Sequence, residues 1–151
     1  MLKLAATRVF TGAEMLVGAT VQIEGGVITH VSPGIQPGAT LLEGLLAPGL
    51  VDIQVNGGGG VLFNDAPTVD SLRTITQAHA RLGVTALMAT LISDERGKIA
   101  AAIDAVNQGI REGMPGLLGL HLEGPWLSEP RRGVHPQRYL RAMDAEDLAL
   151  V

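Results

Sequence analysis

After Pro48 the chain alternates short apolar runs with longer amphipathic segments, and this alternation limits the possible folds more than any other feature. Short apolar runs bounded by glycine or proline are typical of buried strands, and apolar residues every three or four positions are typical of helices. The predicted strands are residues 50–55, 84–91 and 117–123, and the predicted helices are residues 68–82 and a segment that follows Ser93. Strands that alternate with helices form a parallel sheet with right-handed crossovers, so an α/β fold is predicted.

Before Pro48 the chain has the pattern of a small β domain. The strand candidates there are residues 3–10, 21–24, 27–31 and 40–46. Gly25 and Gly26 separate two of these runs, and a glycine pair between alternating runs is a strong hairpin signal. We therefore expect two domains, a β domain at residues 1–48 and an α/β part at residues 49–151.

The predicted strand at 117–123 ends in the carboxylate of Glu123, and Gly124 and Pro125 follow it at once. Parallel α/β folds build their active sites at the carboxyl ends of their strands. His121 shares the face of Glu123, because side chains alternate along a strand. A buried carboxylate needs a partner. From these residues alone, a metal ligand and a structural carboxylate held by backbone amides are equally open readings.

The first strand after Pro48 carries a polar stripe of Asp52, Gln54 and Asn56. Strict alternation places these three side chains on one face, although central parallel strands are usually apolar throughout. Buried polar groups need partners. We expect Asp52 to belong to a hydrogen-bonded layer, and Gln54 and Asn56 to take part in the site.

Two further local features carry predictions. Residues 57–60 are four glycines, but no Lys-Ser or Lys-Thr pair follows them, so they are not a P-loop. We expect them to let the backbone approach a ligand closely. Ser93 is predicted to cap the second helix of the α/β part, with acidic residues near that helix's positive end.

Composition excludes several function classes. The net charge is −4 and the longest basic cluster is Arg131–Arg132, so nucleic-acid binding is not expected. The absence of cysteine rules out disulfides and thiolate metal sites and fits a cytoplasmic protein. No apolar run reaches membrane-spanning length and we see no signal peptide, so no membrane partner is expected.

The last residues favour a longer protein. Asp144 is predicted to begin a helix whose apolar pattern breaks off at Val151. Three strands with two helices cannot cover both faces of a parallel sheet. We expect the chain to be the first part of a larger fold, because a complete eight-stranded barrel needs about 250 residues. A small complete α/β domain is the alternative.

Four segments together resemble a known family. They are residues 46–57, residues 60–65, residues 119–126 with the sequence Gly-Leu-His-Leu-Glu-Gly-Pro-Trp, and residues 133–136. The chain resembles the amidohydrolase superfamily and, within it, the N-acetylglucosamine-6-phosphate deacetylases, over nearly its whole length. The resemblance implies an N-terminal part of a TIM-type (β/α)8 metal-dependent hydrolase barrel, with three β/α units in residues 49–151. Residues 1–48 would form part of a small β-sandwich domain.

The resemblance also implies a reaction, the removal of acetate from N-acetylglucosamine 6-phosphate to give glucosamine 6-phosphate. Glu123 matches a metal ligand of the family, and Val134 and His135 match positions that contact the substrate. The family's remaining ligands and its catalytic aspartate would lie beyond Val151, so we expect the 151 residues alone to be inactive. The implied partners are a phosphorylated amino sugar and, for the complete protein, a second identical subunit.

One departure from the superfamily pattern bears on the metal. Many members carry His-x-His where this chain has Gln54 and Asn56. An amide oxygen is a much weaker ligand for a transition metal than imidazole. We therefore expect one tightly bound divalent ion, zinc, with ferrous iron as the alternative. Two other readings stay open: another amidohydrolase acting on cyclic amides, and a non-catalytic remnant of the fold.

Overall fold

A computed structural model describes residues 1–151 and shows two compact units, Met1–Pro48 and Gly49–Val151. The chain passes from one unit to the other between Pro48 and Gly49. None of the helices is both long enough and apolar enough to cross a bilayer.

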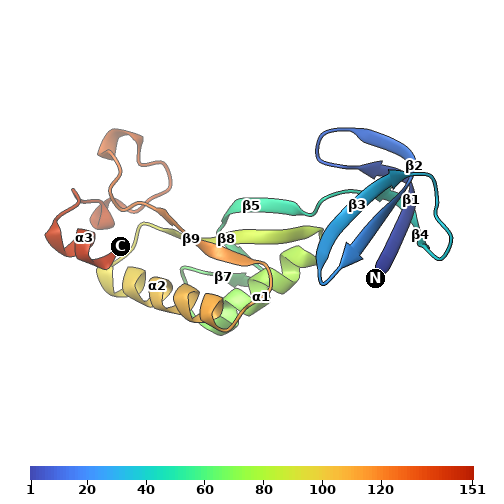
Figure 1. Cartoon of the computed structure of the whole chain (residues 1–151). Helices are drawn as coiled ribbons and strands as arrows, with labels where there is room; N and C mark the ends of the chain where they lie inside the picture. Colours follow the sequence, from blue (N-terminus) through green and yellow to red (C-terminus); the bar gives the residue numbers. More distant parts are fainter. The chain divides into compact units, whose positions relative to one another are not determined.

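The first unit is a four-stranded sheet with the order β3-β2-β1-β4 (Figure 1). Its strands are β1 (Leu2–Phe10), β2 (Met15–Glu24), β3 (Val27–Pro33) and β4 (Thr40–Leu46). β1 is antiparallel to β2 and parallel to β4, and β2 and β3 form a hairpin. Gly25 and Gly26 turn that hairpin with φ of 57° and 81°. Positive φ at both positions suits a tight hairpin turn, and the predicted hairpin is confirmed.

The second unit is built on a parallel three-stranded sheet with the order β5-β8-β9. Its strands are β5 (Leu50–Val55), β8 (Val84–Ile92) and β9 (Leu117–Glu123), with a short β6 (Gly57–Gly58) and β7 (Val61–Leu62) hairpin after β5. Its helices are α1 (Val69–Ala80), α2 (Arg96–Arg111) and α3 (Ala145–Leu150), with single 3-10 turns η1 (Glu129–Arg131) and η2 (Gln137–Tyr139). The predicted α/β arrangement is confirmed.

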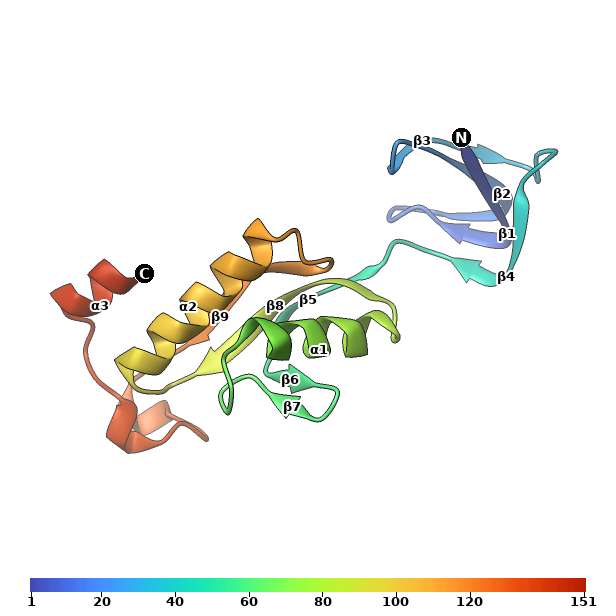
Figure 2. The same cartoon turned by 90° about the horizontal axis from the view of Figure 1, so that it is seen from below.

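α1 and α2 lie on the same face of this sheet (Figures 1 and 2). Thr68 caps α1, since its hydroxyl accepts a hydrogen bond from the backbone of Ser71. Leu72 and Ile75 of α1 are fully buried against the sheet. The core between helices and sheet also holds Val55, Phe63, Leu87, Leu91, Ile99 and Val106. The opposite face of the sheet carries no helix of this chain (Figure 1).

The structure corrects the prediction for Ser93. Glu95, not Ser93, stands at the N-cap of α2, and no side chain makes a capping hydrogen bond there. Ser93 is buried, and its hydroxyl is engaged elsewhere. Ser93 therefore makes no capping hydrogen bond to α2, and its hydroxyl is part of the site described below.

The glycine run packs against α1. A Cβ on Gly57 would lie 2.2 Å from the carbonyl oxygen of Val61, and one on Gly58 would lie 2.9 Å from the ring of His79. The ring Nε2 of His79 is also 2.9 Å from the carbonyl oxygen of Gly57. These glycines therefore allow a close approach to α1 and within the β6-β7 hairpin, and a ligand contact of the glycine run stays a prediction.

The polar stripe on β5 does not follow strict alternation. The register between β5 and β8 shifts between Asp52 and Val55, so these two residues pair with Leu87 and Ala89, both core residues. One extra residue in β5 relative to β8 produces this shift. The Asp52 carboxylate accepts a hydrogen bond from the backbone of Gln54. The expectation that Asp52 shares one face with the later polar residues of the stripe is therefore corrected.

Candidate functional site at the carboxyl end of the parallel sheet

Glu123 is the last residue of β9, and its side chain is 31% exposed. It lies in register with Ile92, the last residue of β8. The carboxylate thus stands at the edge of the sheet where two neighbouring strands end, which is where α/β folds place their reactive groups.

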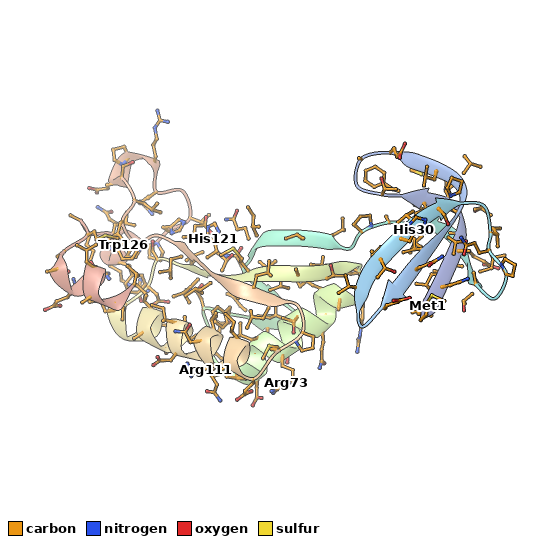
Figure 3. All side chains as sticks on the ribbon, viewed as in Figure 1. Met1, His30, Arg73, Arg111, His121 and Trp126 are labelled. Carbon is orange, nitrogen blue, oxygen red and sulfur yellow. The ribbon has the colours of Figure 1, made fainter.

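His121 ties β9 to β5 across the middle strand. Its Nδ1 lies 3.0 Å from the carbonyl oxygen of Ile53, and a carbonyl oxygen only accepts hydrogen bonds. Nδ1 of His121 therefore carries a hydrogen, which leaves Nε2 of the neutral ring as an acceptor. Figure 3 shows this side chain on the face of the sheet away from α1 and α2.

His135 is buried although it lies in the loop region after β9. Its Nε2 is 3.5 Å from Oε1 of Glu123. Its Nδ1 is 2.8 Å from the hydroxyl oxygen of Ser93 and accepts the backbone N–H of Ser93 at 3.3 Å. The imidazole thus contacts Glu123, which ends β9, and Ser93, which directly follows β8.

Asn64 holds the end of β8 in place from the segment after β7. Its amide oxygen accepts the N–H of Ile92, and its amide nitrogen donates to the carbonyl oxygen of Ile92 and to the carboxylate of Asp94. Burial opposes ionisation of Asp94, but hydrogen bonds from the backbone of Glu95 and from Asn64 outweigh it and lower the pKa of Asp94. Ser93 lies between these anchored residues.

The other predicted site residues are more exposed to solvent than His135. Val134 is 85% exposed beside His135. Gln54 is exposed at the end of β5 and Asn56 is half-buried. Thr90, in register with His121, has a fully buried hydroxyl without a hydrogen-bond partner, and such groups in proteins call for an explanation.

A second polar cluster fastens the segment after Glu123. The buried carboxylate of Asp147 accepts hydrogen bonds from Arg96 at 2.8 Å, Arg141 at 2.8 Å and the Trp126 indole at 3.0 Å. Hydrogen bonds from Arg141 and Arg96 hold the pKa of Asp147 far below its ordinary value. Trp126 therefore has a structural contact on this chain, while Asp144 caps α3 as predicted.

The donor set on this chain is too small to hold a metal ion by itself. No group of three or more histidine, cysteine, aspartate or glutamate side chains is gathered at one place. Protein zinc sites use three or four ligands. The half-exposed carboxylate of Glu123 suits one of those positions, so the arrangement fits a partial site.

Sequence reasoning identified Glu123 and His135 but missed Ser93 and Asn64 as parts of this arrangement. Ser93 looks like a helix cap, and the residue that it contacts is 42 positions away. The sequence signal available for Ser93 was its position directly after the carboxyl end of a predicted parallel strand, at the edge of the sheet where Glu123 also lies.

No protein-family model matches the chain. Among curated proteins, it is 36% identical over 157 residues to an N-acetylgalactosamine-6-phosphate deacetylase of Shewanella sp. (strain ANA-3), covering 99% of this chain and 40% of that protein. It is 31% identical over 143 residues to an N-acetylglucosamine-6-phosphate deacetylase of Haemophilus influenzae, covering 91% of this chain and 38% of that one. The chain thus spans about 40% of the length of these relatives.

Among solved structures, the chain is also similar to deacetylases. An N-acetyl-D-glucosamine-6-phosphate deacetylase from Mycobacterium smegmatis superposes with a TM-score of 0.88 at 30% identity, covering 99% of this chain and 43% of that one. The N-acetylglucosamine-6-phosphate deacetylase of Pasteurella multocida gives 0.88 at 26%, covering 98% of this chain and 41% of that one. Over nearly its whole length, this chain is a homologue of the N-terminal part of the N-acetylglucosamine-6-phosphate deacetylases.

Proposed function

We propose that the complete protein hydrolyses the acetamide bond of N-acetylglucosamine 6-phosphate, releasing acetate and glucosamine 6-phosphate. The observation that carries this proposal is the meeting of Glu123 and His135, 3.5 Å apart, at the carboxyl end of a sheet that superposes on deacetylases. One Mycobacterium smegmatis homologue, with a TM-score of 0.85, is a variant enzyme in complex with N-acetyl-D-glucosamine-6-phosphate. These observations support the metal-ligand reading of Glu123 over the structural one.

The epimeric sugar N-acetylgalactosamine 6-phosphate is a second candidate substrate. The Shewanella relative, which matches 99% of this chain, carries that name. The two sugars differ only in the orientation of one hydroxyl group. Both belong to the same reaction class, so they are alternatives for one active site.

The architecture proposed for the complete protein is a (β/α)8 barrel. β5, β8 and β9 with their helices would be its first three β/α units, and the sheet of Met1–Pro48 would be part of a β-sandwich. Active sites of such barrels lie at the carboxyl ends of the strands, where Glu123 ends β9.

We propose that Glu123 binds one divalent ion, zinc, with ferrous iron as the alternative. Its other ligands would come from the part of the relatives' length that this chain does not span. When bound, such an ion activates water and polarises a carbonyl group. Gln54 and Asn56 offer amide groups, which are weak ligands, and this favours one tightly held ion over two.

The residues of this chain would mainly bind and orient the sugar. Ser93 holds the His135 ring by hydrogen bonds next to Glu123, where the ring would meet a substrate group. Val134, exposed beside it, would contact the sugar with its apolar surface. Gln54 and Asn56 would supply amide hydrogen bonds from the end of β5.

The proposal also covers the location and the partners of the complete protein. The substrate is a phosphorylated sugar, which fits the cytoplasmic location expected from the cysteine-free composition. Assembly into a homodimer and the absence of nucleic-acid and membrane partners stay predictions.

An acetate-release assay on the protein expressed from its complete gene tests the function. Both phosphosugar epimers and unphosphorylated N-acetylglucosamine serve as substrates. A cyclic amide such as dihydrouracil has no acetyl group to release, so its hydrolysis is followed separately as ring opening. We expect one of the two phosphosugars to give the highest kcat/KM. Hydrolysis of the cyclic amide alone, or of no substrate after loading with zinc, contradicts the proposal.

A further inference from the structure

We propose that Ser93 is a positioning residue that holds His135 with its hydrogen on Nε2, so that His135 faces the ligand as a hydrogen-bond donor. This inference rests on the proposed function for its meaning, since it says how His135 would meet the substrate. The groups that face the two ring nitrogens of His135 support it.

The Nδ1 side of His135 faces two groups of Ser93, the backbone N–H and the hydroxyl. The backbone N–H of Ser93 points at Nδ1 at a distance of 3.3 Å, and the Ser93 hydroxyl oxygen lies 2.8 Å from the same nitrogen. A backbone N–H has no lone pair to offer. The N–H therefore favours an unprotonated Nδ1, and the hydroxyl, which can donate or accept, then donates a second hydrogen bond to it.

The Nε2 side of the ring faces a group that accepts. Oε1 of Glu123 lies 3.5 Å from Nε2, and an ionised carboxylate only accepts hydrogen bonds. Both neighbours of His135 thus favour the same neutral tautomer. The hydrogen bonds of Ser93 carry the inference, because Glu123 lies at an ion-pair distance and makes no hydrogen bond to the ring.

This tautomer separates His135 from the metal-ligating histidines. A ligating histidine donates its second ring N–H to a carboxylate or a carbonyl oxygen. His121 does donate in that way, from Nδ1 to the carbonyl oxygen of Ile53 at 3.0 Å. His135 has the reverse arrangement, so its Nε2 offers a hydrogen where a ligand would offer a lone pair.

Ser93 is itself fixed from two sides. Asn64 bonds both backbone groups of Ile92 and the side chain of Asp94, the two residues that flank Ser93. On the other side, a Cβ on Gly124 would lie 2.2 Å from the Ser93 hydroxyl oxygen. The hydroxyl thus has little freedom to leave His135, as a positioning role requires.

The tautomer can be read directly by NMR. The complete protein, loaded with zinc and labelled with ¹⁵N-histidine, is observed above the ordinary histidine pKa of about 6.5. Substitutions His135→Gln and His121→Gln assign the two rings. We expect a protonated Nε2 in His135 and a protonated Nδ1 in His121, within one spectrum. A protonated Nδ1 in wild-type His135 overturns the inference, whatever the enzyme hydrolyses.

Kinetics then test whether Ser93 acts through His135. We expect Ser93→Ala to lower kcat/KM by roughly five- to tenfold, the worth of one hydrogen bond, and to mix the two tautomers of His135. In a His135→Gln background the same change should have no further effect, because the two residues act as one unit. Ser71→Ala, a buried serine of α1, is the matched control and should change neither readout.

The outcomes separate this inference from the proposed function. A wild-type enzyme that releases acetate with the expected His135 tautomer supports both. Acetate release with the reverse tautomer removes only the role of Ser93, and so does a full additive loss in the double variant. The expected tautomer without any acetate release leaves the geometry standing and removes the deacetylase proposal.

Discussion

Gly124 is the position where one added methyl group should do most damage to the site. Its φ is 90°, a conformation that costs a residue with a side chain about 1–2 kcal/mol. In addition, a Cβ there would lie 2.2 Å from the Ser93 hydroxyl oxygen and 3.2 Å from a Leu127 methyl group. Forcing a methyl group into a packed site costs about 1–3 kcal/mol.

These terms together predict that Gly124→Ala lowers the free energy of unfolding by about 2–5 kcal/mol. Gly133 supplies the matched control, because it lies in the same segment with φ of 57° and has no atom near its would-be Cβ. Gly133→Ala should lose only the backbone term, about 1–2 kcal/mol. The difference between the two variants isolates the collision with Ser93 and Leu127.

Urea denaturation of the complete protein, followed by circular dichroism, measures this difference from the midpoints at an unchanged slope. Acetate release by folded Gly124→Ala should also fall, because Ser93 must move away from His135. Equal losses in the Gly124 and Gly133 variants would refute the reasoning. So would a Gly124 variant as stable as the wild type.

Three other predictions follow from the structure. The folded pKa of Asp147 is lowered, so the stability that its carboxylate contributes is present above the ordinary pKa of 3.8 and is lost progressively at lower pH. Asp147→Asn should therefore make the free energy of unfolding less dependent on pH in acid, which denaturation as a function of pH measures. Phe63→Ala should lower the free energy of unfolding by about 3–5 kcal/mol, whereas Leu62→Ala, at a half-exposed position, should lose under about 1 kcal/mol. Chelation should abolish acetate release and zinc should restore it; activity that survives complete removal of metal would contradict this.

Local patterns predicted the elements of the second unit and the hairpin turn of the first, because these features depend on near neighbours. The apolar runs at β5, β8 and β9 are strands, and Thr68 marks the start of α1 within a residue of the predicted boundary. Gly25 and Gly26 form the predicted turn because their conformation is set within the turn itself.

Contacts between distant segments were beyond such patterns. Ser93 has the sequence position of a helix cap, but it bonds His135 because the loop after β9 returns to the end of β8. The register shift on β5 depends on pairing with β8, so alternation alone misplaced Asp52. His135 looked like an ordinary loop histidine, and only the fold buries it beside Glu123.

The central claim is that the carboxylate of Glu123 binds a catalytic divalent ion. A crystal structure of the complete protein, grown with zinc and either phosphosugar product, tests it most directly. We predict a single ion with a Glu123 oxygen at about 2.0–2.2 Å and with Nε2 of His135 outside the coordination shell. An ion held elsewhere, with Glu123 turned away and bonded only to protein groups, would contradict the account.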